Sequence, residues 1–99
     1  MAIKAQDPIR PGEILLEDFL QRLGISQYAL AKAISVPARR INEIVQGKRG
    51  ITADTALRLG RYFGVSPQSW MNLQAHYDLE IAELNLGKRL DDEVQPRAA

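Results

Sequence analysis

Hydrophobic residues recur at steps of three and four along most of the chain, which is the spacing of helices with one buried face. In the first such segment, Leu15, Phe19 and Leu23 fall on one face. Pro11 precedes them in a position that suits a first helical turn, and Gly24 follows as a terminator. The pattern therefore predicts a first helix from Pro11 to Gly24 with these three side chains directed at a core.

Three shorter helices are predicted between residues 26 and 64. Ser26 and Thr52 are residues that cap helix N-termini, Pro37 suits a helix start, and Gly47 and Gly64 suit helix ends. The predicted apolar faces consist of Ala29, Leu30, Ala33 and Ile34, then Ile41, Ile44 and Val45, then Ala56, Leu59 and Phe63. Helices this short cannot bury a face alone, so they must share one core with their neighbours.

The last periodic segment opens with Ser66 and Pro67, in the usual order of cap and proline. Its apolar positions are Trp70, Leu73, Tyr77, Ile81 and Leu84. They predict a helix over about 66–85, whose first part covers the small bundle. The sequence thus divides into an N-terminal arm (1–10), an all-α domain of five helices (11–86) and a frayed, charge-rich tail without periodicity (87–99).

Composition narrows the class of protein further. With 99 residues and 45% hydrophobic content, the chain suits a single domain, and 6% aromatic residues favour an aliphatic core. There is no cysteine, which excludes disulfides and thiolate ligands and fits a reducing compartment. Because no signal peptide or membrane span is recognisable, we expect a cytoplasmic protein without a membrane partner.

The net charge of +1 hides an uneven distribution. Residues 22–61 contain eight basic residues against Glu43 and Asp54, a net charge of +6, so the two flanks together carry −5. A basic middle is a candidate surface for a polyanion, and acidic flanks are available to a basic partner. The alternative is that solvated helix faces carry these charges by chance.

The segment "SVPARRINEIVQG" carries the most informative side chains. On a helical wheel, Arg39, Glu43 and Gln46 lie opposite the apolar face, with Arg40 and Asn42 at its flanks. Arginines, an acid and amides are the side chains that read base edges and phosphates, and one helix fits a major groove about 12 Å wide.

These residues carry a resemblance to a known family. "SQYALAKAISVPARRINEIVQG" resembles the helix-turn-helix of the lambda-repressor-like, or XRE, family. The matching positions are Gln27, Leu30, Ala31, Ile34, Val36, Ile41 and Ile44. Ser35 departs from the pattern, because the family commonly has glycine in this turn. A left-handed backbone is costly for other residues, so we expect a slightly different turn here.

The wider pattern from Pro11 to Ala82 is similar to the HigA-type antitoxins of toxin–antitoxin modules. The resemblance implies a lambda-repressor-like DNA-binding domain, with its helix-turn-helix at about 26–46 and an extended C-terminal helix. It also implies a homodimer that binds an inverted-repeat operator in double-stranded DNA at its own promoter. Such a repressor would neutralise a HigB or RelE-like mRNA-cleaving toxin.

The resemblance assigns candidate roles to individual residues. Ala38, Arg39 and Glu43 occupy positions that face bases, although Glu43 also suits an i,i+4 ion pair with Arg39 and Ala38 also suits the helix interface. The candidate phosphate contacts are Gln27, Arg40, Asn42, Lys48 and Arg49. The alternative for "GKRG" is an ordinary solvated turn.

The C-terminal end of the last helix extends beyond what a five-helix core needs. We therefore place dimer contacts at Ile81, Leu84 and Leu86, with a frayed helix end as the alternative. A dimer is needed because two recognition helices must reach major grooves about 34 Å apart.

Catalysis and cofactor binding are not expected. His76 is the only histidine, and with Glu80 but no cysteine it falls short of the usual metal-ligand sets. Two other functions stay open beside the antitoxin repressor. One is a protein-only toxin inhibitor that uses the acidic flanks, namely Glu13, Glu17, Asp18, Asp78, Glu80 and Glu83. The other is a phage-type repressor without a toxin.

Overall fold

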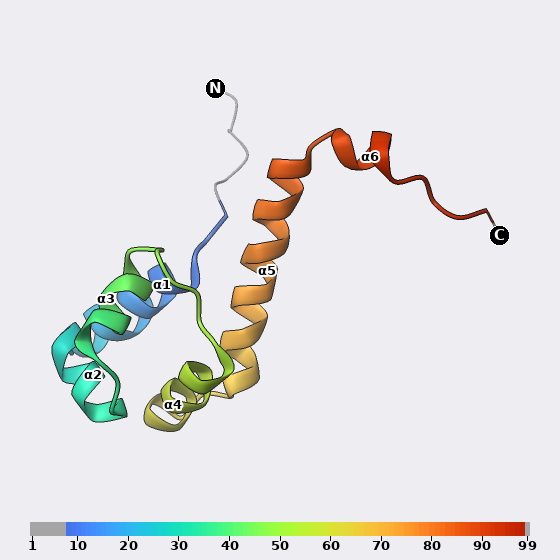
Figure 1. Ribbon diagram of the computed structural model, residues 1–99. Coiled ribbons are helices and arrows are strands. Elements are labelled where there is room, and N and C mark those ends of the chain that lie inside the picture. The colour runs from blue at the N-terminus through green and yellow to red at the C-terminus, as the bar shows by residue number, and fades with distance from the viewer. Residues whose placement is uncertain (1–7, 99) are drawn as a thin grey trace.

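The computed structural model describes residues 8–98, and within them every regular element is a helix (Figure 1). The elements are α1 Pro11–Ile14, η1 Leu15–Gln21, α2 Gln27–Ile34, α3 Ala38–Val45, α4 Ala53–Phe63, α5 Pro67–Leu86 and α6 Arg89–Glu93. The predicted all-α class is confirmed. Of the predicted N-terminal arm (1–10), residues 1–7 lie outside the described part.

The first predicted helix is α1 continued by η1, a π-helix in which hydrogen bonds join residues five apart. This spacing brings Leu15 and Leu20 to the core, where both are buried. Leu23 is 59% exposed, so its predicted place in the core is wrong. The reason is that the wider turn rotates the end of the helix away from the face that a step of four would have given it.

The predicted capping residues begin their helices as expected. Ser26 and Thr52 accept hydrogen bonds from the backbone N–H groups of Ala29 and Thr55, at 3.0 Å and 3.4 Å. The Ser66 hydroxyl accepts from the N–H of Gln68 at 3.1 Å. Each bond satisfies an N–H group that the helix itself leaves without a partner. Pro37 is the residue before α3 rather than its first residue.

The turn between α2 and α3 is left-handed at Ser35, with φ 60° and ψ 48°. The expectation of a different turn is therefore wrong, because Ser35 adopts the conformation that glycine usually supplies. The N–H of Val36 donates to the carbonyl of Ala31 at 3.0 Å, which closes the turn. Val36 can then enter the core beside α2.

The core is largely aliphatic and lies between η1, α2, α3, α4 and the start of α5. Its buried hydrophobic residues are Leu15, Leu20, Leu30, Ala31, Ile34, Val36, Ile41, Ile44, Val45, Ile51, Ala56, Leu59 and Trp70. On α2 the buried face is formed by Leu30, Ala31 and Ile34. The predicted Ala29 and Ala33 are exposed, because the α2 helix turns its Ala31 side to its neighbours.

The helix α5 projects from the bundle along much of its length (Figure 1). Trp70 at its start is buried and stacks at 5.1 Å from Phe19, which itself lies 4.7 Å from Phe63. Farther along, Ile81 is half-buried and Leu84 is 65% exposed. The segment 87–99, expected to be a frayed tail, contains the short helix α6, none of whose residues is buried.

Candidate nucleic-acid interface

The helix α3 has two chemically opposite faces. Ile41, Ile44 and Val45 are buried, as their spacing predicted. The Arg39 side chain is 86% exposed on the other face. Ala38 is exposed at the start of the helix. The apolar face fixes α3 to the bundle, so its N-terminal residues are presented to solvent in the manner of a recognition helix.

The Glu43 carboxylate is held between two arginines. One oxygen accepts from Arg39 Nε at 3.0 Å and the other from Arg49 Nε at 2.9 Å. The hydrogen bonds from Arg49 and then Arg39 lower the pKa of Glu43 below its ordinary value of 4.5, so the group is ionised at neutral pH. The structure thus contains the predicted i,i+4 pair and adds a second arginine from the α3–α4 link.

Gln27 and Asn42 lie next to each other although they are 15 residues apart. Asn42 Nδ2 donates to Gln27 Oε1 at 3.3 Å, which joins the start of α2 to the middle of α3. Two of the predicted phosphate contacts therefore share one small polar surface. It lies at the N-terminus of α2, where backbone N–H groups favour an anion.

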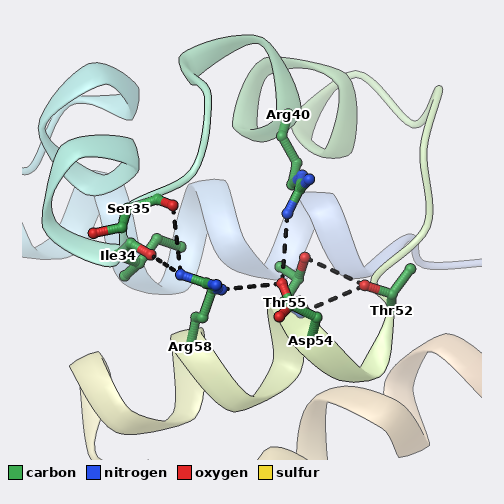
Figure 2. A network of polar contacts seen from close by, with 7 residues as sticks. All are labelled: Ile34, Ser35, Arg40, Thr52, Asp54, Thr55 and Arg58. Carbon is green, nitrogen blue, oxygen red and sulfur yellow. Dashed lines mark hydrogen bonds and ion pairs between the residues drawn. The ribbon is translucent and has the colours of Figure 1, made fainter.

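The two adjacent arginines of α3 differ in their surroundings. Arg40 Nη1 lies 3.5 Å from Asp54 Oδ2, and the Arg40 side chain is only 31% exposed (Figure 2). The wheel had placed Arg40 on the flank of the outer face, and the ion pair ties that flank to α4. Arg39 is therefore the one of the two that is directed outward.

Arg58 of α4 is a structural residue that the sequence reading missed. Its Nη1 donates to the carbonyl of Ile34 at 2.9 Å and to that of Ser35 at 3.4 Å, while its Nε bonds Asp54 at 3.0 Å (Figure 2). It supplies donors to the carbonyls of the last residue of α2 and of the residue that caps it, which have no partner within that helix. The i,i+4 spacing of Asp54 and Arg58 predicts their pairing, but the link to α2 has no sequence signal.

The link from α3 to α4 carries the predicted Lys48 and Arg49, and both are exposed. Arg10 lies beside this link, where its Nη2 donates to the carbonyl of Val45 at 3.1 Å. Gly47 has a φ of 79°, and a Cβ there would lie 2.6 Å from Arg10 Nε. The end of α3 is thus closed by a side chain from the N-terminal segment, another contact that the sequence reading missed.

The predicted dimer residues lie on the outer half of α5 and at its end. Ile81 and Leu86 are half-buried and Leu84 is exposed. Leu79 is also 65% exposed, although the predicted set omitted it. Large apolar side chains left in water on a projecting helix are typical of an interaction surface.

His76, the only histidine that the sequence offers as a metal ligand, lies on α5. His76 Nε2 lies 3.4 Å from Glu80 Oε1 on the exposed side of α5. Residues 8–98 contain no group of three or more potential metal-ligating side chains. Within the same residues, each helix is too short or too polar to span a membrane.

Known proteins resemble this chain in sequence and in structure. The chain matches the protein family described as helix-turn-helix over residues 16–70. It is 63% identical over 75 residues to virulence-associated protein I of Dichelobacter nodosus, which covers 76% of this chain and 69% of that protein. It is 35% identical over 72 residues to antitoxin HigA-1 of Vibrio cholerae, and the match covers 73% of this chain and 68% of that protein. The structure of Pseudomonas aeruginosa antitoxin HigA with the higBA promoter has a TM-score of 0.89 and 50% identity, covering 92% of this chain and 99% of that one.

Proposed function

The chain belongs to the helix-turn-helix family, and we propose that it is a DNA-binding repressor that acts as an antitoxin. It binds an inverted-repeat operator in its own promoter as a homodimer. It also neutralises a HigB or RelE-like mRNA-cleaving toxin in the cytoplasm. The solved HigA structure with its promoter supports the DNA-binding part of the proposal.

The two-faced helix α3 is the observation that carries the proposal. Its buried Ile41 and Ile44 hold it rigidly, and its exposed Arg39 points away from the bundle. Arg39 reads a guanine, since an arginine can donate two hydrogen bonds to the major-groove edge of that base. Ala38 contacts a base methyl group nearby. Glu43 takes part by keeping Arg39 in place and by accepting from a base where one is in reach.

Phosphate contacts surround this reading face. We assign them to Gln27 and Asn42, which bond each other, to Lys48 and Arg49, which are exposed in the link after α3, and to Arg40 on the flank. Such contacts fix affinity and register without reading sequence. Because Arg40 already pairs with Asp54, we expect it to contribute less than Lys48.

Binding to DNA tests these roles directly. Fluorescence anisotropy with the DNA upstream of the gene gives the dissociation constant for the parent and for Arg39→Ala, Lys48→Ala and Arg89→Ala. Arg39→Ala should relax the preference at one operator position, worth about 1–3 kcal/mol. Lys48→Ala should weaken all sequences alike and lower the salt slope by about one unit.

Arg89→Ala is the matched control, because it removes the same charge from α6, whose Arg89 pairs with Glu93 at 3.4 Å. Arg89→Ala should leave the dissociation constant for operator DNA nearly unchanged. If the parent has no preference for its operator over competitor DNA, the repressor function is wrong and a protein-only toxin inhibitor is the better explanation. If Arg39→Ala and Lys48→Ala behave identically, the division into base and phosphate contacts is wrong.

A homodimer through α5 is supported by the exposed apolar side chains of that helix. Leu79 and Leu84 are each 65% exposed, and Ile81 and Leu86 lie near them in sequence. Leu84→Lys should convert a dimer to a monomer in light scattering and weaken operator binding. Leu57→Lys is the matched control, because Leu57 is a similarly exposed leucine (61%) on α4.

The toxin partner requires an independent test. A neighbouring gene for a small basic protein would be co-expressed with this chain and assayed for inhibition of translation. We expect the pair to co-purify and translation to be restored. A chain that binds its operator but has no such neighbour and no such effect would instead be a phage-type repressor.

A further inference from the structure

The link between α3 and α4 is held in place from the side of α5. The backbone N–H of Ile51 donates to Gln74 Oε1 at 2.7 Å, in a partly buried position. Ile51 itself is buried in the core, so both its side chain and its N–H are fixed. Gln74 lies at the start of the third turn of α5, 23 residues further along the chain.

The Gln74 amide is oriented by a second contact. Its Nε2 donates to Asp78 Oδ1 at 2.9 Å, one turn along the same helix. Because the amide nitrogen is directed toward a carboxylate, the amide oxygen is left facing the Ile51 N–H. A Cβ on Gly50 would lie 3.1–3.2 Å from the amide atoms of Gln74, so the backbone of the link passes close against this side chain.

We infer that Gln74 is a positioning residue for DNA binding, which rests on the DNA-binding function proposed above. The segment that it holds carries Lys48 and Arg49, the candidate phosphate contacts that follow the recognition helix. Arg49 is tied at the other end to Glu43 of α3. Gln74 therefore fixes the end of the basic link against α5, while the pair of Arg49 and Glu43 ties the link to α3.

Loss of the hydrogen bond between Gln74 and Ile51 should lower the affinity for DNA more than the preference for one DNA sequence. Without the Gln74 acceptor, the Ile51 N–H and the adjoining link gain freedom that must be lost again when phosphates bind. The base-reading face is held by the buried residues of α3, and Arg39 keeps its own hydrogen bond to Glu43. Operator and non-specific DNA should therefore be weakened by similar factors.

The test uses the full chain with Gln74→Met, which keeps the length of the side chain but removes its acceptor and donor. Gln68→Met is the matched control, because Gln68 lies on the same helix and its side-chain amide bonds Asn72 at the exposed surface. We expect Gln74→Met to weaken operator binding about threefold to tenfold, the range for loss of one hydrogen bond. We expect less than a twofold change for Gln68→Met.

Two readouts separate positioning from general damage to the fold. The ratio of operator to scrambled-DNA affinity should stay that of the parent. In addition, Gln74→Met should add little once Lys48 and Arg49 have been replaced by alanine, because its effect passes through them. Gln74→Asn, whose shorter amide cannot reach Ile51, should reproduce both results and replaces Gln74→Met if that variant does not fold.

Several outcomes would overturn the assignment. In one, Gln74→Met accelerates hydrogen exchange of the Ile51 amide but leaves the affinity for DNA unchanged. In another, Gln74→Met weakens DNA binding by the same factor after Lys48 and Arg49 have been replaced by alanine. A fall in sequence preference would show that α3 itself is disturbed. If the parent protein does not prefer its operator, the proposed function fails first and the role of Gln74 fails with it.

Discussion

Arg58 joins α2 to α4, and its removal should destabilise the whole domain. Its Nη1 donates at 2.9 Å to the carbonyl of Ile34, which ends α2, and its Nε lies 3.0 Å from Asp54 Oδ2 (Figure 2). The Ile34 carbonyl is partly buried and belongs to the end of a helix, where a cation is favoured. Arg58→Ala leaves this carbonyl without its donor.

The magnitude follows from the two shorter contacts of Arg58, because the bond to the Ser35 carbonyl is long at 3.4 Å. A hydrogen bond to a charged donor contributes about 1.5–3 kcal/mol. The ion pair adds at most about 0.5 kcal/mol, because Arg58 and Asp54 are 40% and 58% exposed. Allowing for water that replaces part of the lost bond, we expect Arg58→Ala to lower the free energy of unfolding by about 2 kcal/mol. For a domain of this size that corresponds to roughly 8–16 °C in Tm.

The assay is urea unfolding at low and high salt, with Arg61→Ala as the matched control. Arg61 is an exposed arginine of the same helix, and its side chain has no hydrogen bond or ion pair with residues 8–98. Its removal should cost less than about 0.5 kcal/mol. The Arg58→Ala loss should persist in about 1 M salt, which screens exposed ion pairs. A loss equal to that of Arg61→Ala, or one that salt abolishes, would refute the role assigned to the Ile34 carbonyl.

Three further substitutions test local features by thermal or urea unfolding. A Cβ on Gly12 would overlap the carbonyl oxygen of Ile44. Gly12→Ala should therefore lower the free energy of unfolding by about 2 kcal/mol or more, and it should also weaken DNA binding because it displaces α3. An unchanged Tm would contradict this close approach. Ser35→Gly removes the side chain from a left-handed residue and should raise the free energy of unfolding by about 0 to 1 kcal/mol. Ala33→Gly in α2 is the control and should lower it by about 1 kcal/mol. Equal losses in the two variants would argue against a strained turn. Because the pKa of Glu43 is lowered in the folded protein, its carboxylate stabilises the fold above pH 4.5 and this contribution is lost as the pH falls through the lowered pKa. The stability difference between the parent and Glu43→Gln should therefore be constant from pH 7 to 5 and vanish at lower pH, and a difference that grows in acid would reverse the sign of the argument.

Most helix boundaries and the outward face of α3 were predictable from the sequence because their causes are local. Ser26, Thr52 and Ser66 cap helices through bonds to residues two or three positions away. Ile41 and Ile44 share a face because of the helical repeat alone. The pairing of Arg39 with Glu43 is likewise an i,i+4 contact, and it was one of the alternatives that the sequence left open.

The tertiary structure alone decided the contacts between distant segments. Arg58 reaches Ile34 across 24 positions, Gln74 reaches Ile51 across 23, and Arg10 reaches Val45 across 35. No periodicity encodes such pairs, because they depend on how the helices cross. The π-helical η1 is a related case, since it placed Leu20 in the core and left Leu23 in water against the repeat of an α-helix. The sequence by itself determined which residues lie on the outward face of α3, and packing between helices decided how that face is held.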